Sequence, residues 1–378
     1  MNNVSNVSRG MIFIPDISGF TKFVNDTEIK HSQHIIKELI EILIDANILN
    51  LQISEIEGDA ILFYRLGQAP VAGEIADQAR KMFLAFHQHL RAIERDRVCH
   101  CGACSTAGDL TLKFFVHYGD ISISRIKHHE KLMGASVILA HRLMKNEIEG
   151  QEYVLMTRDY LESQSDEKYI SCFNWDQLKA GSIVYEHIGE VTYQYIMLSA
   201  LHAEVRELVP YNPPQKFSDP IVIDIFIAAP MSLVYNVITD LGLRVEWTDG
   251  LKDIEYDNSE ILRIGAKHVC DLPAGQVELE TIYGKRQKDV IEYAERATRD
   301  GMLKNVTSHF ILTDSCDGTG VKMEFHYQKR KVIGRLIDLI MRKKITEGLR
   351  HSATLLKSLC ERLYQKAASQ VTNEKAMM

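Results

Sequence analysis

Two short stretches, residues 12–21 (IFIPDISGFT) and residues 55–63 (EIEGDAILF), decide the fold of this 378-residue chain. Each carries one aspartate close to a glycine beside an apolar run, Asp16 in the first and Asp59 in the second. The first pattern predicts a strand that turns into a helix, and the second predicts a tight hairpin between two strands. Either stretch alone is also ordinary turn chemistry. Together, two carboxylates on adjacent strands predict a site for hard divalent cations such as Mg²⁺.

The pair of stretches resembles the catalytic core of the class III nucleotidyl cyclases, whose first strand reads Phe-x-Asp-Ile-x-Gly-Phe-Thr and whose hairpin carries Gly-Asp. The resemblance continues over most of residues 9–200. Residues 112–119 (LKFFVHYG) resemble the family's strand ending in His-x-Gly. Residues 134–143 (GASVILAHRL) resemble its Gly-x-x-Val-Asn-x-Ala-x-Arg helix, and residues 153–157 (YVLMT) fit the strand that follows.

This resemblance implies a metal site and a phosphate site. In the cyclases two metal ions, Mg²⁺ or Mn²⁺, are held by two aspartates that match Asp16 and Asp59, and Ile17 is placed with them. Backbone amides that open the first helix would cradle the phosphates of a purine nucleoside triphosphate. Those amides belong to Gly19, Phe20 and Thr21. Because the family's active site forms between two such domains, a single copy implies a homodimer.

The base-selecting and catalytic positions match the family only in part. Glu55 fits the choice of guanine, whereas Lys131, at the second base-selecting position, fits neither known pairing. Arg142 matches the arginine that stabilises the transition state, but Ile138 replaces the asparagine four residues earlier. The stretch 183–189, where a phosphate-binding lysine is expected, contains no lysine. Loss of one such donor costs about 10²–10³ in rate, so the pattern favours binding of metal and nucleotide over cyclisation.

The periodicity of apolar residues predicts an α+β fold. Counted from the first strand, the expected β-α-β-β-α-β order matches the ferredoxin-like core, and the resemblance to the cyclases implies a cyclase-type domain over residues 9–205. The predicted elements are a helix at about 28–47, strands at 50–56 and 60–64, a long helix through 75–93, strands at 110–118 and 120–126, and a helix at 134–146.

A proline-rich linker is predicted at 206–218, and a second domain at 219–368. Its expected order is a strand at 221–227, two short helices, a run of strands and one long helix over about 332–370. This order resembles the helix-grip fold of START-like domains, the polyketide-cyclase and lipid-transfer superfamily. The resemblance implies an apolar cavity for a small hydrophobic ligand. Aromatic residues that would line it, or would otherwise be plain core, are Trp247, Tyr283, Tyr293, Phe310 and Phe325.

Three of the seven cysteines, Cys99, Cys101 and Cys104, crowd into one short segment. Their sulfurs, with a fourth ligand from His87, His89 or His100, offer enough donors for zinc. The spacing is tighter than that of a usual zinc finger, and no second Cys-x-x-Cys accompanies it. Ordinary thiols in an ordered loop and a redox-sensitive cluster are the alternatives.

The composition is that of a soluble globular protein, with 46% hydrophobic and 25% charged residues. A net charge of −7 argues against a general binder of nucleic acid or anionic membranes. The sequence has no apolar stretch long enough for a membrane span and no apolar signal region at its start, which predicts a cytoplasmic protein.

These observations leave three functions open. The first is a cytoplasmic signalling protein whose divergent, catalytically degenerate cyclase-like domain binds Mg²⁺ and a purine nucleotide and is coupled to the ligand-binding domain. The second is an active guanylate or adenylate cyclase. The third is a lipid- or polyketide-binding protein in which the cyclase-like half serves as a dimerisation scaffold.

Overall fold

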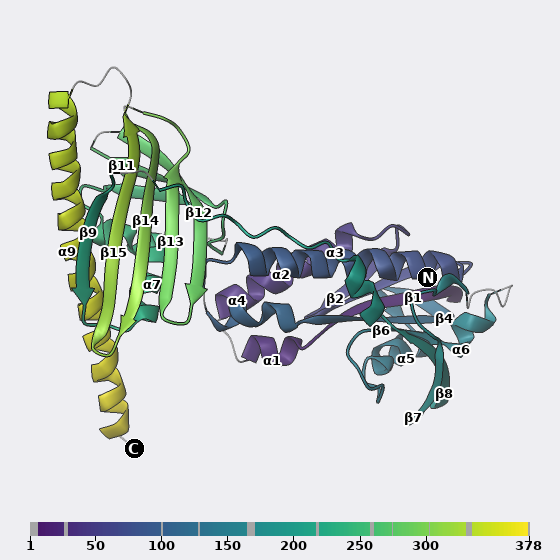
Figure 1. Cartoon of the computed structure of the whole chain (residues 1–378). Coiled ribbons are helices and arrows are strands. Elements are labelled where there is room, and N and C mark those ends of the chain that lie inside the picture. The colour runs from purple at the N-terminus through teal and green to yellow at the C-terminus, as the bar shows by residue number, and fades with distance from the viewer. Residues whose placement is uncertain are drawn as a thin grey trace. The chain divides into compact units, whose positions relative to one another are not determined.

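The computed structural model shows an α+β protein that divides into two compact units (Figure 1). The first unit runs to Leu208 and the second begins at Val209, but the segment that starts at Arg95 belongs to the second unit. No helix among the described residues is long and apolar enough to cross a membrane. The described residues are 7–25, 29–99, 101–127, 129–164, 171–216, 219–257, 261–273, 275–301, 303–329 and 335–376.

The first unit is built on a sheet in the order β2-β3-β1-β4-β6-β8-β7, with β5 paired to β4. Strand β1 lies between β3 and β4 and is antiparallel to both. The strands are β1 (Val7–Ser18), β2 (Gln52–Glu57), β3 (Ala60–Leu66), β4 (Thr111–Ile126), β5 (His129–Met133), β6 (Tyr153–Thr157), β7 (Lys179–Tyr185) and β8 (Gly189–Met197). Residues 11–15 of β1 are all buried, which is typical of a strand covered on both faces.

Helices cover the two faces of this sheet, with α2 and α3 on one face and α5 on the other (Figure 1). Leu39 of α2 and Phe83 of α3 are fully buried, as the helical spacing of the apolar residues predicts. On the opposite face, Leu143 of α5 packs in one cluster with Ile12 and Ile14 of β1. The helices are α1 (Phe20–Asn25), α2 (Ile29–Asp45), α3 (Ala72–Asp96), α4 (Gly102–Thr106), η1 (Ala107–Asp109), α5 (Ala135–Leu143), α6 (Arg158–Glu162) and η3 (Ser199–Glu204).

One prediction for this unit is wrong: the two strands expected at 110–118 and 120–126 are one continuous strand, β4. Gly119, which suggested a break, remains paired with Gly10 of β1. A Cβ atom on Gly119 would stand 2.4 Å from the Ser136 hydroxyl oxygen. The glycine therefore allows α5 to approach the strand closely, and it does not end the strand.

The second unit consists of a seven-stranded antiparallel sheet, short helices and one long helix. The sheet order is β10-β11-β12-β13-β14-β15-β9. The elements are β9 (Ile221–Ile227), α7 (Met231–Thr239), η4 (Leu241–Leu243), α8 (Arg244–Trp247), β10 (Asp253–Tyr256), β11 (Lys267–Leu272), β12 (Gly275–Gln287), β13 (Val290–Ala297), β14 (Leu303–Ser315), β15 (Gly318–Lys329) and α9 (Arg335–Ala376). Helix α9 packs against β9, α7 and α8.

Aromatic side chains fill the core of the second unit. Trp247, Tyr293 and Phe310 are buried in the same cluster as Leu356 of α9. The Phe310 ring lies 6.1 Å from the Trp247 ring and 6.1 Å from the Tyr293 ring, measured between centroids. These residues therefore pack against one another as core. By contrast, three apolar side chains on the first turns of α9 are exposed: Ile337, Leu339 and Ile340.

Candidate functional site

A cleft lies where the end of β1, the β2–β3 turn and the start of β4 meet. Its volume is about 380 Å³, and its lining residues are 16–22, Asp59, Lys113 and Gln151. This group contains every residue that the sequence analysis assigned to the metal and phosphate sites. We call it the Asp16 cleft.

The two aspartates are brought together by strand pairing. Asp16 lies opposite Ala60 in the β1–β3 ladder, and the backbone N–H of Ile17 donates to the carbonyl oxygen of Asp59 at 3.0 Å. Burial raises the pKa of Asp16 from 3.8 to about 6, with the charge of Asp59 adding to the effect and that of Lys113 opposing it. Burial also raises the pKa of Asp59. The cleft therefore holds two carboxylates whose ionised forms are disfavoured without a nearby cation.

Gly19 makes the turn from β1 into α1. Its φ of +90° lies in the left-handed region that glycine adopts readily. The Gly19 carbonyl accepts the N–H of Phe23 at 3.0 Å, which starts the helix. The Phe20 ring lies against the hairpin, 3.5 Å from where a Cβ of Gly58 would stand. The turn that lines the cleft is therefore packed directly on the hairpin that carries Asp59.

Two further polar groups, Lys113 and Ser18, line the cleft. Lys113 of β4 lies directly opposite Asp16 in the β1–β4 ladder. The buried hydroxyl of Ser18 has no hydrogen-bond partner within the described part of the chain. An unpaired buried hydroxyl is costly, and a polar ligand in the cleft would relieve that cost. Lys113 was not predicted from the sequence as part of the metal or phosphate site, although it lies in the strand predicted at 110–118.

The residues predicted for base selection and catalysis lie outside the Asp16 cleft of their own chain. One Glu55 carboxylate oxygen lies 3.3 Å from His141 Nε2. Lys131 is exposed on β5, opposite Ser124. The Arg142 guanidinium is also exposed and donates to the carbonyl of Glu186 at 3.5 Å. The structure thus gathers the predicted metal and phosphate residues, and it leaves these three apart from them.

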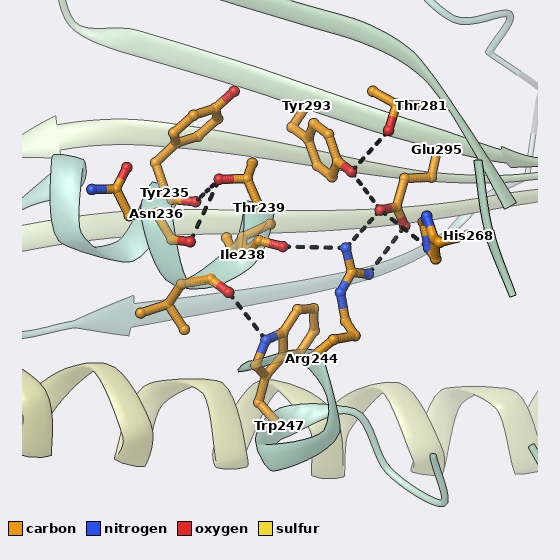
Figure 2. Close-up of polar contacts among 11 residues, drawn as sticks. Tyr235, Asn236, Ile238, Thr239, Arg244, Trp247, His268, Thr281, Tyr293 and Glu295 are labelled. Atoms are coloured by element: carbon orange, nitrogen blue, oxygen red, sulfur yellow. Dashed lines mark hydrogen bonds and ion pairs between the residues drawn. The ribbon is translucent and has the colours of Figure 1, made fainter. Parts of the chain in front are cut away.

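A second group of buried charges lies in the other unit (Figure 2). The Arg244 guanidinium donates to both carboxylate oxygens of Glu295, at 3.0 and 2.6 Å. The Tyr293 hydroxyl also donates to Glu295, and His268 Nε2 lies 3.8 Å from the same carboxylate. Burial alone raises the pKa of Glu295, but Arg244, helped by His268 and Tyr293, holds the pKa below its usual range. Burial lowers the pKa of His268, which favours a neutral ring.

Fold and site together define an α+β protein with a cleft that contains two aspartates in one unit and a buried Arg244–Glu295 ion pair in the other. The family model described as "Protein of unknown function (DUF2652)" matches residues 36–153. The uncharacterized protein Rv2561/Rv2562 of Mycobacterium tuberculosis is 31% identical over 165 residues, which cover 43% of this chain and 73% of that relative. The chain belongs to the same family as this mycobacterial protein.

Among solved structures, the chain is similar to cyclase catalytic domains over about half of its length. The adenylyl cyclase CyaB from P. aeruginosa is 14% identical with a TM-score of 0.36, and the match covers 50% of this chain and 95% of that chain. The guanylate cyclase domain of RhGC from Catenaria anguillulae, solved in complex with GTP, is 16% identical with a TM-score of 0.36, and the match covers 50% and 95%.

Proposed function

We propose that the first unit is a nucleotidyl cyclase-like domain that binds Mg²⁺ or Mn²⁺ and a purine nucleoside triphosphate in the Asp16 cleft. The observation that carries this proposal is the pair of half-buried carboxylates, Asp16 at the end of β1 and Asp59 in the β2–β3 turn, of which Asp16 has a pKa raised to about 6. The motif around them is also the part of the sequence that resembles the class III cyclases most closely.

The donor set of the cleft fits a hard divalent cation. Carboxylate and carbonyl oxygens are the ligands that Mg²⁺ prefers, and Asp16, Asp59 and the backbone of Ile17 supply them. A cation between the two carboxylates would remove the repulsion that contributes to the raised pKa of Asp16. When bound, such ions polarise phosphoryl oxygens and neutralise charge that develops on them.

The chain's own residues would position the nucleotide. Lys113 places a cation beside the two aspartates, where it can pair with a phosphate. The hydroxyl of Ser18 and the backbone amides of Gly19, Phe20 and Thr21 line the same cleft as hydrogen-bond donors. Together with Lys22, which lines the same cleft, they give two cationic side chains and several neutral donors for a polyphosphate.

We also propose that the domain converts little nucleotide to cyclic product. Ile138 is exposed on α5 and has no polar group to offer a developing charge, in the position where the cyclases have an asparagine. Arg142 lies outside the cleft of its own chain, so only a partner's arginine, in a homodimer, would reach the nucleotide. The small hydrophobic ligand of the second unit stays a prediction from the resemblance to START-like domains.

Equilibrium binding of labelled GTP and ATP tests this function directly. We expect wild-type protein to bind nucleotide in Mg²⁺ or Mn²⁺, and to lose at least about tenfold in affinity, or about 1.4 kcal/mol, when EDTA is added. Asp59→Asn should show the same loss with metal present. Glu162→Gln, which changes an exposed carboxylate on α6, is the matched control and should bind normally.

The same samples decide between a sensor and an enzyme. Wild-type protein incubated with Mn²⁺ and GTP or ATP should release little or no cyclic nucleotide. Abundant product that disappears in Asp59→Asn would instead establish an active cyclase. Metal-independent binding, or no binding at all, would refute the proposed site and leave the dimerisation scaffold as the remaining function.

A further inference from the structure

We propose that Cys99, Cys101, Cys104 and His31 form a structural zinc site. One ligand atom of each residue lies within 4.8 Å of the others. His31 belongs to the first turn of α2, about seventy residues before the cysteines in the chain. This site is separate from the Asp16 cleft, and the inference does not depend on nucleotide binding.

The distances between the His31 nitrogen and the cysteine sulfurs are close to the edge lengths of a zinc coordination tetrahedron. With Zn–S near 2.3 Å and Zn–N near 2.0–2.1 Å, tetrahedral geometry sets sulfur and nitrogen about 3.6 Å apart and two sulfurs about 3.8 Å apart. His31 Nδ1 lies 3.1 Å from Cys101 Sγ and 3.6 Å from Cys104 Sγ. A metal at the centre would need only small side-chain adjustments.

The local backbone holds the ligands in place. Cys101 is the N-cap of α4, and its sulfur accepts the backbone N–H of Cys104 at 3.4 Å. This bond holds the Cys101 sulfur in place beside the other ligands. Helix α4 packs against both α1 and α2, which brings Cys104 to the side chain of His31. Cys104 is buried, and the other three ligands are half-buried.

The chemistry of the ligand set selects zinc over the harder cations. Three sulfurs and one imidazole suit Zn²⁺, whereas Mg²⁺ and Ca²⁺ require oxygen donors. Four protein ligands also leave no open position for a substrate, which is the arrangement of a structural site. Because α4 and the start of α2 both contact α1, zinc here would fix the helix that follows the Gly19 turn.

The fourth ligand differs from His87 and His89, two of the three histidines that the sequence suggested. His87 Nε2 lies 2.8 Å from a carboxylate oxygen of Glu152, and His89 Nε2 lies 3.2 Å from Glu38. The third, His100, lies outside the described residues. Among the described histidines His31 lies beside the sulfurs, because packing of α4 on α2, and not nearness in sequence, brings it there.

Metal analysis of the full-length protein is the first test. Protein expressed with added zinc and purified without chelators should contain about one zinc per chain. Cys101→Ser should lose most of it, whereas Cys316→Ser, which changes an exposed cysteine of the β14–β15 turn, should keep it. Wild-type protein that holds no zinc after incubation with Zn²⁺ would overturn the site and leave ordinary or redox-sensitive thiols.

A second test does not require the cysteine variants to fold. Wild-type protein loaded with Co²⁺ should show the visible bands of a tetrahedral site and a thiolate-to-metal charge-transfer band. Competition with a chromophoric chelator should show zinc affinity reduced at least about tenfold in His31→Ala. His34→Ala, on the same helix but hydrogen-bonded to Glu38, is the matched control. An octahedral cobalt spectrum, or equal affinities for both histidine variants, would contradict the proposal.

Discussion

Asp16 and Glu295 are both carboxylates removed from water, yet their pKa values shift in opposite directions. Burial and the neighbouring Asp59 raise the pKa of Asp16 to about 6, and Lys113 offsets only part of the effect. Glu295 is more deeply buried, at 1% exposure, but Arg244 binds both of its oxygens and keeps its pKa low.

The difference separates a ligand site from a structural ion pair. The charge of Glu295 is balanced inside the second unit, so that cluster is complete without a ligand. The pKa values of Asp16 and Asp59 stay raised although the charge of Lys113 opposes the shift, and the Ser18 hydroxyl in the same cleft has no partner among the described residues. A strongly shifted pKa is therefore informative about function only together with the charges that surround the group.

Breaking the Arg244–Glu295 ion pair should have the largest effect on stability. Glu295→Gln leaves the Arg244 guanidinium buried without a counter-charge, and we expect a loss of about 3–5 kcal/mol in the free energy of unfolding. Trp247 lies beside Arg244 and reports on this unit, so urea unfolding can be followed by its fluorescence in a Trp175→Phe background. A loss below about 1 kcal/mol would contradict the assigned role of the pair.

Replacing both partners sharpens the same comparison. In the double variant Arg244→Met, Glu295→Leu, neither charge is left alone, and apolar side chains of similar volume replace them. We expect this variant to be more stable than Glu295→Gln. A double variant as unstable as the single one would show that hydrogen bonds to Tyr293 and Ile238, and not charge balance, dominate.

Removing the charge of Asp16, next to Asp59, should have a smaller effect on the free energy of unfolding and should stabilise the protein. The rise of the Asp16 pKa from 3.8 to about 6 corresponds to about 3 kcal/mol against folding at a pH above both values. In EDTA at pH 8, Asp16→Asn should therefore stabilise the first unit by up to about 3 kcal/mol. This gain should shrink as the pH falls from about 6 and vanish below 3.8, where Asp16 is protonated in both states. Thermal unfolding across this pH range measures it, and a gain that is independent of pH would contradict it.

An exposed ion pair should show almost no effect. Arg158 and Glu162 pair on the surface of α6 with side chains that are 70% and 60% exposed. Glu162→Gln should change the free energy of unfolding by less than about 0.5 kcal/mol. A larger change would mean that solvent screens charges of the first unit less than this comparison assumes.

Much of the architecture could be predicted because the deciding signals are local. The strand around Asp16, the hairpin at Asp59 and the long helices each follow from apolar periodicity and turn residues. The continuous strand β4 could not be predicted, because Gly119 is a turn residue by composition and its role depends on how closely α5 approaches.

The sites were predictable to a different extent, because they depend on strand register and helix packing. Asp16 and Asp59 carry recognisable motifs, but no local signal sets Lys113 opposite Asp16; that depends on the β1–β4 register. The place of His31 beside the cysteines could not be predicted either, since residues near a helix start commonly face solvent. Only the packing of α4 on α2 turns it toward Cys101.

Mn²⁺ binding, followed by the loss of the free-ion paramagnetic resonance signal, tests the central claim most directly. It asks whether the Asp16 cleft takes up a cation, independently of nucleotide and turnover. We predict that wild-type protein and Glu162→Gln bind Mn²⁺ alike and that Asp16→Asn binds at least about tenfold more weakly. Equal Mn²⁺ affinity in wild-type protein and Asp16→Asn would contradict the account.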